Sequence, residues 1–511
     1  MFQLYAIIIV GIAHAADRGY LLDAFPREWL TPEISAAAAI APILLALLGQ
    51  WLVVCVAASR LARRRGARWI VAAERALLGA QWIILISYAG SVLACGWHRW
   101  VQVFFGGDVI LADLIITITP PLLGLWLTWI IHYPIVRRLR DAIALRALDE
   151  GVPLRPVQGR LRYALLQMRL HVLFLLIPLL LIVTWSEIVE LWFDGAGVDP
   201  TEALLSEAAT LAGAVIVFAV APVIARLVLE LRTMPSGQVR DDLLQICRDH
   251  KVNVRDVLLW ETDGAMINGA VMGILGRLRY VMLTDALLES MRREQVHAVM
   301  AHEIGHVRRH HIPWLIAALM SAILLPSFVA DWTMRIAIAS DWLHGPPAWW
   351  MDAGGMFAIL GVAFVMFGWI SRRFERQADA FAVQHLSGLR EARGEQDEGS
   401  EITPDAAAAM TTALELVGTL NAVDPERRSW RHGSIRWRQR NLVSLVGRPL
   451  RRLPIDRTVQ WIKAAVAVVL LVLLPFIIQD VIMMSQQQPP TPTDTRAELR
   501  RAWEEWRRMN D

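Results

Sequence analysis

The chain has 511 residues, of which 55% are hydrophobic, and its mean hydropathy is +0.41. These values lie above those of soluble globular domains and favour a membrane protein. The formal net charge of +3 is small for this length, so the composition indicates no nucleic-acid partner. The three cysteines are far apart in the sequence, which excludes a disulfide framework and a cysteine-based metal cluster. Any metal site must therefore use histidine and carboxylate ligands.

Eight apolar runs are long enough to cross the hydrocarbon core of a bilayer. In chain order they are Ile34–Ala58, Leu77–Cys95, Val109–Ile131, Val172–Leu191, Ala208–Leu229, Pro313–Trp332, Gly355–Ile370 and Trp461–Met484. An earlier apolar run, Leu4–Ala16, is too short to span comfortably. A signal peptide and an interfacial helix are both open interpretations of it.

The arginines predict the orientation, because positively charged loops stay on the cytoplasmic side of a membrane. The loops after the first and third runs are strongly basic, with Arg60, Arg63, Arg64, Arg65, Arg68 and Arg75 in one and Arg137, Arg138, Arg140, Arg146, Arg155, Arg160, Arg162 and Arg169 in the other. Alternation from these loops places 230–312 and 371–457 in the cytoplasm. We expect an integral membrane protein, in the inner membrane if the source is bacterial.

The first long cytoplasmic segment has a strand-rich part followed by a helical part. Val254–Trp260, Met266–Met272 and Arg277–Leu283 are rich in β-forming residues, and Asp263-Gly264 predicts a hairpin between the first two. We therefore expect a small meander. Helical sequence then runs from Thr284 to His310.

The second cytoplasmic segment is predicted to be mainly helical. A helix over Ser371–His385 is followed by a polar loop over Arg393–Thr403 and a further helix over Pro404–Val423. After the last apolar run, Ser485–Asp494 is typical of a linker, and the remaining residues predict an amphipathic helix.

These patterns predict a mainly α fold, a multi-spanning membrane helix bundle with a small α+β cytoplasmic domain that two spans divide. The predicted regions are an N-terminal extracytoplasmic segment (1–33), a five-span membrane region (34–230), the first half of the cytoplasmic domain (231–312), two further spans (313–370), its second half (371–460), an eighth span (461–484), and a linker with a terminal helix (485–511).

The sequence from Ala301 to His306 contains the motif HExxH. Residues four apart lie on one face of a helix, so the imidazoles of His302 and His306 can approach one metal ion. Glu303, next to the first histidine, is then directed at a metal-bound water. The motif predicts a zinc-dependent hydrolase.

A catalytic zinc needs three protein ligands and one open position. A third histidine at metzincin spacing would fall on Ile312, so the ligand must come from elsewhere. The segment Ser371–Asp379 supplies carboxylates at the cytoplasmic end of the seventh run. The pattern of two helices is typical of a gluzincin.

The chain resembles the integral-membrane zinc peptidases that include the type I CAAX prenyl proteases and the bacterial HtpX-like heat-shock proteases. The matching sequences are INGAVMG, GRLRYVMLTDALL, AHEIGH, SRRFERQADAFA and RHGSIRWRQRNL, which occur between about Asn268 and Leu442. Five spans before the HExxH helix are similar to the prenyl-protease layout, whereas the eighth span and the tail lie outside that pattern.

The resemblance implies a membrane-embedded zinc endopeptidase with one zinc ion per chain. His302, His306 and Glu375 would be the metal ligands. Glu303 would be the general base that takes a proton from a zinc-activated water. Asp379, one helical turn after Glu375, would accept a hydrogen bond from a ligand imidazole.

The resemblance also implies roles for residues outside the two helices. His432 and Arg438 would stabilise the oxyanion or bind substrate, and Asn268 and Ala270 would lie on an edge strand that pairs with an extended peptide. Gly433 departs from the family, where a proline often follows the late histidine.

The expected partners are a peptide or membrane-protein substrate and the lipid bilayer, with no nucleic acid; the oligomeric state stays open. The substrate could be lipidated or a misfolded membrane protein. A transporter or channel is a rival class, although its pathway would need more ionisable residues within the spans. An inactive homologue that serves as a membrane scaffold or chaperone is another. No functional role is predicted for His98, His132, His171, His250, His297, His310, His311, His344 and His385.

Overall fold

In the computed structural model, eight helices are long and apolar enough to cross a membrane among the residues that the structure describes. They are α2 (Pro32–Ala62), α3 (Arg68–Leu93), α5 (Ala112–Asp149), α6 with a π-helical turn and α7 (Arg160–Met168, Arg169–Leu173, Phe174–Phe193), α8 (Pro200–Val228), α12 (His311–Ala339), α13 (Trp349–Leu386) and α16 (Pro454–Gln486). Each overlaps one predicted run, so the mainly α, multi-spanning fold class is confirmed. The described residues are 4–17, 31–63, 66, 68–105, 110–149, 158–193, 200–262, 264, 266–340, 349–389, 401–421, 423–451, 453–486, 504 and 508.

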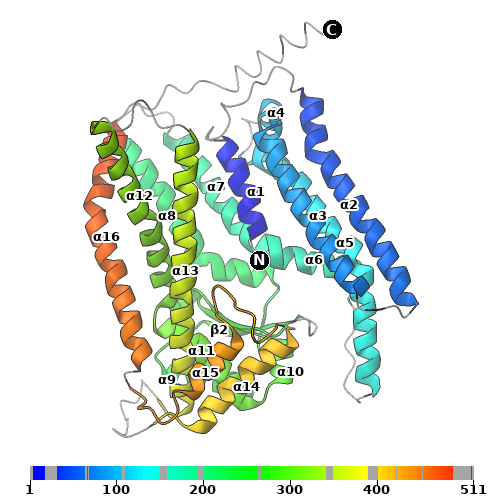
Figure 1. The fold of residues 1–511 in the computed structure, drawn as a ribbon, viewed down its shortest axis with the longest axis vertical. Helices are drawn as coiled ribbons and strands as arrows, with labels where there is room; N and C mark the ends of the chain where they lie inside the picture. Colours follow the sequence, from blue (N-terminus) through cyan, green and yellow to red (C-terminus); the bar gives the residue numbers. More distant parts are fainter. Residues whose placement is uncertain are drawn as a thin grey trace. The chain divides into compact units, whose positions relative to one another are not determined.

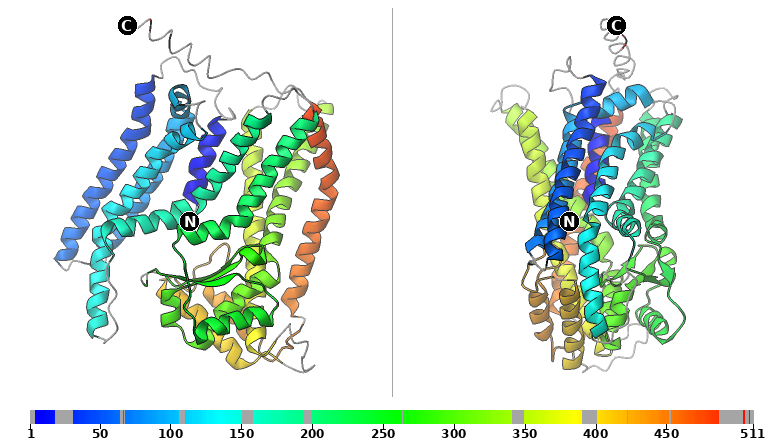
Figure 2. Two further views of the ribbon diagram at one scale, coloured as in Figure 1. Left: turned by 180° about the vertical axis from the view of Figure 1, so that it is seen from behind. Right: turned by 90° about the vertical axis from the view of Figure 1, so that its right-hand side faces the viewer.

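The chain divides into two compact units. Unit 1 comprises Met1–Leu229 and Ser485–Asp511, and unit 2 comprises Glu230–Met484. Unit 1 holds α1 to α8, including the short helix α4 (Trp97–Phe105), and Figure 2 shows its long helices from two directions. Little of the predicted linker and tail lies within the described residues, which there include only 485–486, 504 and 508.

In unit 1, the short N-terminal run forms α1 (Leu4–Asp17) and packs in the core of the bundle with Ile9 fully buried. The hydroxyl of Tyr5 donates to Gln81 at 2.9 Å, and the hydroxyl of Tyr88 donates to the carbonyl of Ile9 at 3.0 Å. Hydrogen bonds between buried groups are strong in an apolar surrounding. In this structure α1 is therefore a packed core helix, which the sequence left undecided.

Unit 2 contains a four-stranded sheet with the order β1-β2-β4-β3. The strands are β1 (Arg232–Thr233), β2 (Asp256–Trp260), β3 (Gly269–Met272) and β4 (Tyr280–Thr284). β4 lies between β2 and β3, parallel to the first and antiparallel to the second. The predicted meander with a hairpin between β2 and β3 is therefore wrong.

The connection between β2 and β3 explains the error. It spans residues 261–268, which is too long for a two-residue turn, and Asp263 lies outside the described residues. Asp285 instead holds this connection, since its carboxylate accepts hydrogen bonds from the backbone and hydroxyl of Thr262 and from the backbone of Gly264. The connection therefore joins two strands, β2 and β3, that lie on opposite sides of β4.

The described part of unit 2 also contains a 3-10 helix, η2 (Gly276–Leu278), and five shorter α-helices, which Figure 1 shows with the sheet at one end of α12, α13 and α16. They are α9 (Gln238–Asp249), α10 (Asp285–Ser290), α11 (Arg293–Arg308), α14 (Pro404–Leu420) and α15 (Ile435–Val443). The single helix predicted from Thr284 to His310 is two helices. The side chain of Gln295 accepts a hydrogen bond from the backbone of Arg292 at 3.0 Å and starts a new helix there.

Helices α11 and α13 pack closely at Gly305. A Cβ atom placed there would lie 3.1 Å from the side chain of Phe381, which is tighter than most contacts between side chains. Helix α13 continues without a break from the apolar seventh run into the segment that carries Glu375 and Asp379. The span therefore positions these two carboxylates directly. Of the predicted polar loop after α13, residues 393–400 lie outside the described residues.

Candidate active site

Three predicted ligands meet where α11 packs on α13. The Nε2 atoms of His302 and His306 lie 3.2 Å apart. One carboxylate oxygen of Glu375 is 3.7 Å from Nε2 of His302, and the other is 3.7 Å from Nε2 of His306. Within the described residues, this is the group of histidine and acidic side chains that could hold a metal ion.

The donor set fits zinc in both chemistry and spacing. Two imidazoles and one carboxylate are the ligands of many catalytic zinc sites. With zinc–ligand bonds of about 2.0–2.1 Å in a tetrahedral arrangement, neighbouring donor atoms lie roughly 3.3 Å apart. The observed 3.2 and 3.7 Å are close to that separation.

The rear nitrogen of His302 faces Asp379. Its Nδ1 atom is 2.9 Å from the carboxylate of Asp379, which is fully buried. Arg438 holds the same carboxylate through two hydrogen bonds of 2.8 and 2.6 Å. Burial lowers the pKa of His302, but the hydrogen bond and charge of Asp379 outweigh it, so the pKa is raised. The carboxylate therefore fixes the ring with Nε2 directed at the metal site.

For His306, burial outweighs the effect of the nearby carboxylates and lowers the pKa to about 4. Its imidazole is therefore neutral at physiological pH and free to donate an electron pair to a metal. The rear nitrogen, Nδ1, lies 3.0 Å from Nδ1 of His311. Sequence reasoning gave no role to His311, because the position five residues after a ligand is part of no motif.

Glu303 lies beside the ligands and is partly buried. Desolvation is the main cause that raises its pKa to about 7, helped by the charge of Glu375 and opposed by His302 and by a hydrogen bond from the backbone N–H of Val271. A carboxyl group with this pKa can both accept and release a proton near neutral pH.

The strand that carries Val271 is the edge strand β3. The N–H of Thr284 donates to the carbonyl of Asn268 at 3.0 Å, and opposite pairs alternate along an antiparallel ladder. The backbone groups of Asn268 and Ala270 therefore face β4, whereas those of Gly269 and Val271 point away from it. β3 thus has outward N–H and C=O groups next to α11, and one of them, the N–H of Val271, donates to Glu303.

The late motif reaches the site through the segment 423–434. Nδ1 of the half-exposed His432 lies 2.9 Å from a carboxylate oxygen of Glu375. Trp430 fixes the segment on the span α13, since its ring stacks on Phe364 with centroids 4.1 Å apart. Gly433 has φ = +75°, a conformation that proline cannot adopt. The departure from the family proline therefore matches the local backbone.

Arg438 is mostly buried, and besides its two bonds to Asp379 it lies 3.5 Å from Glu375. The charges of both carboxylates raise its pKa against the effect of burial. The guanidinium is therefore engaged with the two carboxylates of α13, and it links the α15 helix to both of them.

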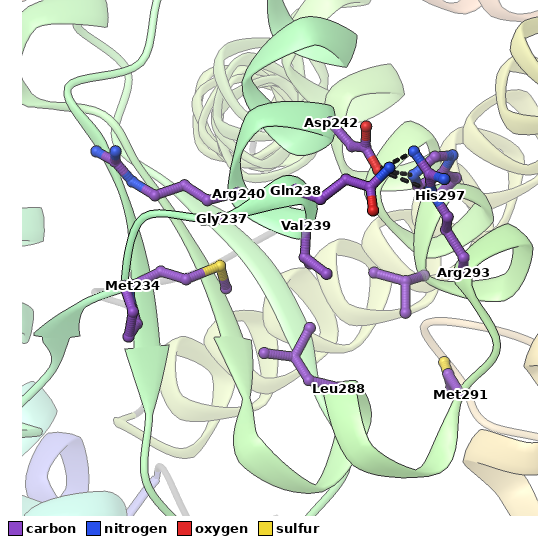
Figure 3. Close-up of a pocket in the computed structure, with 12 residues that line it drawn as sticks. Met234, Gly237, Gln238, Val239, Arg240, Asp242, Leu288, Met291, Arg293 and His297 are labelled. Atoms are coloured by element: carbon purple, nitrogen blue, oxygen red, sulfur yellow. Dashed lines mark hydrogen bonds and ion pairs between the residues drawn. The ribbon is translucent and has the colours of Figure 1, made fainter.

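A separate pocket of about 360 Å³ lies between α9 and the start of α11. Figure 3 shows Asp242 at one end of it, bonded to Arg293 at 2.6 Å and to His297 at 3.3 Å. Arg293 and His297 precede the metal-facing histidines by nine residues each, which places them on the opposite face of α11 at 3.6 residues per turn. None of the predicted site residues lines this pocket.

Part of the chain is similar to known proteins. Residues 249–395 match peptidase family M48. The chain is 25% identical over 161 residues to the protease HtpX of Alkalilimnicola ehrlichii, a match that covers 30% of this chain and 52% of that protein. It is 36% identical over 119 residues to a protease HtpX homolog of Limosilactobacillus fermentum, covering 20% and 38%. The predicted resemblance to the membrane zinc peptidases is thereby confirmed, and the family match covers residues 249–395.

The chain spans about half the length of the curated relatives that it matches. Among solved structures it is similar to the crystal structure of S. mikatae Ste24p, with a TM-score of 0.39 and 14% identity over 80% of this chain and 98% of that one.

Proposed function

We propose that this multi-pass membrane protein, whose residues 249–395 form a peptidase family M48 domain, is a zinc-dependent endopeptidase. One observation carries the proposal: His302 and His306 on α11 converge with Glu375 on α13, and the carboxyl group of Glu303 lies beside them. This is the donor set and base that hydrolysis of a peptide bond needs.

Bound zinc would supply an activated water and polarise the scissile carbonyl. Glu303 takes a proton from the attacking water and delivers it to the leaving amine. Burial raises the pKa of Glu303 to about 7 in the metal-free site, and the greater basicity of the carboxylate favours the first of these transfers. No covalent link between enzyme and substrate is required.

His432 and Arg438 have different roles in this proposal. His432 is half-exposed and next to Glu375, so its ring can turn towards the carbonyl oxygen of a substrate and stabilise the developing negative charge. Arg438 is bound to Asp379 and acts by positioning. It holds Asp379, which in turn orients His302.

The substrate is proposed to lie along β3 as an extended peptide. The outward N–H and C=O of Gly269 and the outward C=O of Val271 can pair with its main chain, whereas the backbone groups of Asn268 and Ala270 face β4. Recognition through the backbone places few demands on sequence. The substrates are then membrane-associated proteins, either lipidated or misfolded, that can present an unfolded segment to the site.

The active site is proposed to face the cytoplasm, and the membrane would be the inner membrane if the source is bacterial. The arginine-rich loops support this orientation. In unit 2, the beginning of α12, the end of α13 and the beginning of α16 all adjoin the sheet and the shorter helices (Figure 1). Both segments that carry site residues would therefore lie on one side of the membrane.

The experiment is cleavage of an unfolded reporter protein by the full chain in proteoliposomes. Glu303→Gln should abolish cleavage while the protein still folds and binds zinc, because only the proton acceptor is removed. Glu294→Gln is the matched control, since Glu294 lies in the exposed first turn of the same helix. Cleavage by Glu303→Gln at the parental rate would contradict the proposal.

A proteomic comparison then addresses the substrate class. Membranes from cells with the parental protein and with Glu303→Gln are compared for peptides whose ends depend on the active enzyme. Lipid-bearing peptides among them would favour a prenyl-protease-like role, and fragments of unassembled membrane proteins would favour quality control.

A further inference from the structure

A chain of hydrogen bonds runs from the second histidine of the HExxH motif to the eighth span. Nδ1 of His306 lies 3.0 Å from Nδ1 of His311, and Nε2 of His311 lies 2.9 Å from the side-chain oxygen of Gln377. The amide nitrogen of Gln377 then donates to the carboxylate of Asp456 at 2.6 Å. His311 and Gln377 are both buried.

The donors and acceptors along this chain have one consistent order. If Nε2 of His306 binds a metal, Nδ1 must carry the proton and donate it to His311. His311 then carries its own proton on Nε2 and donates to the oxygen of Gln377. The amide N–H of Gln377 finally donates to Asp456, whose carboxylate only accepts. Every link is satisfied when His306 has the tautomer that a metal ligand needs.

Asp456, the last residue in this series of hydrogen bonds, lies in the first turn of α16. Asp456 also accepts a hydrogen bond from the backbone of Leu453 at 3.2 Å. Further along α16, Lys463 donates to the backbone carbonyl of Arg309 at 2.6 Å, directly after the end of α11. Between α11 and α12, His310 has φ = +54°, and this left-handed residue turns the chain so that His311 faces back towards His306.

We propose that the first turns of α16 position the metal ligand His306 through the relay formed by Asp456, Gln377 and His311. The inference rests on the proposed zinc site and adds three positioning residues to it. It also gives the eighth span a role. Helix α16 then fixes Nδ1 of His306 through the relay, just as Asp379 fixes Nδ1 of His302.

Packing alone does not account for the relay. The ring of His311 does stack on Phe374, with centroids 4.4 Å apart and planes 9° from parallel, and an apolar residue could fill that space. However, a buried imidazole costs free energy unless its nitrogens are hydrogen-bonded. Here both nitrogens have partners, and one partner is the metal ligand itself.

The relay can be tested by zinc affinity, measured on the metal-free full chain by competition with a chromophoric chelator. His311→Ala should weaken zinc binding by about 10–100-fold, the range for loss of an outer partner of a ligand. Asp456→Ala should weaken it by roughly tenfold, at the low end of that range, because it acts through Gln377. The absorption spectrum of bound Co²⁺ should change in both variants, since it reports ligand geometry.

A rescue variant separates positioning from general loss of structure. Gln377→Glu alone places two carboxylates side by side and should weaken zinc binding. The double variant Gln377→Glu/Asp456→Asn restores an acceptor for His311 and a donor–acceptor pair at the second link, so it should recover most of the affinity. Thr458→Ala, in the same turn region of α16 with an exposed side chain, is the matched control and should bind zinc as the parent does.

The outcomes distinguish this inference from the proposed function. A parental chain that binds no zinc would overturn the metal site and the relay together. Zinc binding by the parent with unchanged affinity and Co²⁺ spectrum in Asp456→Ala would overturn the relay and leave the proposed function intact. Failure of the double variant to recover affinity beyond Gln377→Glu would also count against the relay.

Discussion

Two regions of unit 2 meet at the proposed metal site and are built in different ways. The helix region, α11 and α13, supplies Glu303 and the three proposed ligands from two helices that pack at Gly305. The strand-and-loop region, β3 and the segment 423–434, supplies outward backbone groups and His432, and the stacking of Trp430 on α13 fixes the segment. We therefore expect the helix region to decide metal binding and the strand-and-loop region to decide how substrate is turned over.

The largest effect should come from removing a ligand in the helix region. Glu375→Ala should lower zinc affinity by more than the roughly 10–100-fold that loss of an outer partner costs, and cleavage should fall with it. Elemental analysis after dialysis against a chelator measures the occupancy. Glu415→Ala, an exposed glutamate on α14, is the control. Full zinc occupancy in Glu375→Ala would remove Glu375 from the ligand set.

The strand-and-loop region should affect turnover and leave the metal in place. His432→Ala should lower kcat by roughly a hundredfold with little change in KM, as for loss of one oxyanion donor. Steady-state kinetics at full zinc occupancy measures both constants. Arg428→Ala, on an exposed residue of the same segment, should match the parent. If His432→Ala lost as much zinc as Glu375→Ala, the strand-and-loop region would also decide metal binding, which contradicts the expectation.

The pH dependence should report Glu303. The base must be ionised to accept a proton, so kcat/KM should fall by about tenfold per pH unit below its pKa. That pKa is about 7 in the metal-free site, and a bound cation favours the ionised form, so the acid limb should lie at or below pH 7. Zinc content is measured at each pH because protonation of the histidines releases metal. A rate that stays constant down to about pH 4 with zinc retained would contradict this role, since an ordinary glutamate is by then largely protonated.

The smallest effect should come from the edge of β3. Gly269→Pro removes one N–H that points away from β4, and proline is tolerated on the outer side of an edge strand. Loss of one hydrogen bond worth about 1 kcal/mol should lower kcat/KM roughly fivefold relative to Gly269→Ala. Gly269→Ala adds the same Cβ atom but keeps the N–H, so it is the control. Equal kcat/KM in the two variants would argue against pairing of the substrate with this edge.

The difference between the helix region and the strand-and-loop region also explains what could be predicted from the sequence. His302, Glu303 and His306 lie within one helical turn and a half, so the helix period alone brings them together. The strand order could not be predicted in this way, because it depends on which later strand pairs between β2 and β3. Local turn signals at Gly264 indicated a hairpin, whereas the structure inserts β4 between β2 and β3. His432 and Asn268 had no spacing relative to the motif, and only the resemblance to a family indicated them.

The relay shows a second limit. His311, Gln377 and Asp456 come from three elements, and their sequence separations of 66 and 79 residues carry no periodic signal. One sequence feature could have indicated His311: a histidine directly after the motif helix, at the start of an apolar run, is costly to bury without a partner. The identity of that partner required the fold.

Gly305 limits the metal site although it bears no side chain. Because a Cβ atom at this position would lie only 3.1 Å from Phe381, a larger residue at 305 would push α13 away from α11 by a few tenths of an ångström. Glu375 would move with α13, whereas both histidines would stay with α11. Metal–ligand bonds in a zinc site vary by only about 0.2 Å. Glycine at position 305 therefore sets the distance between the two proposed histidine ligands on α11 and the proposed carboxylate ligand on α13.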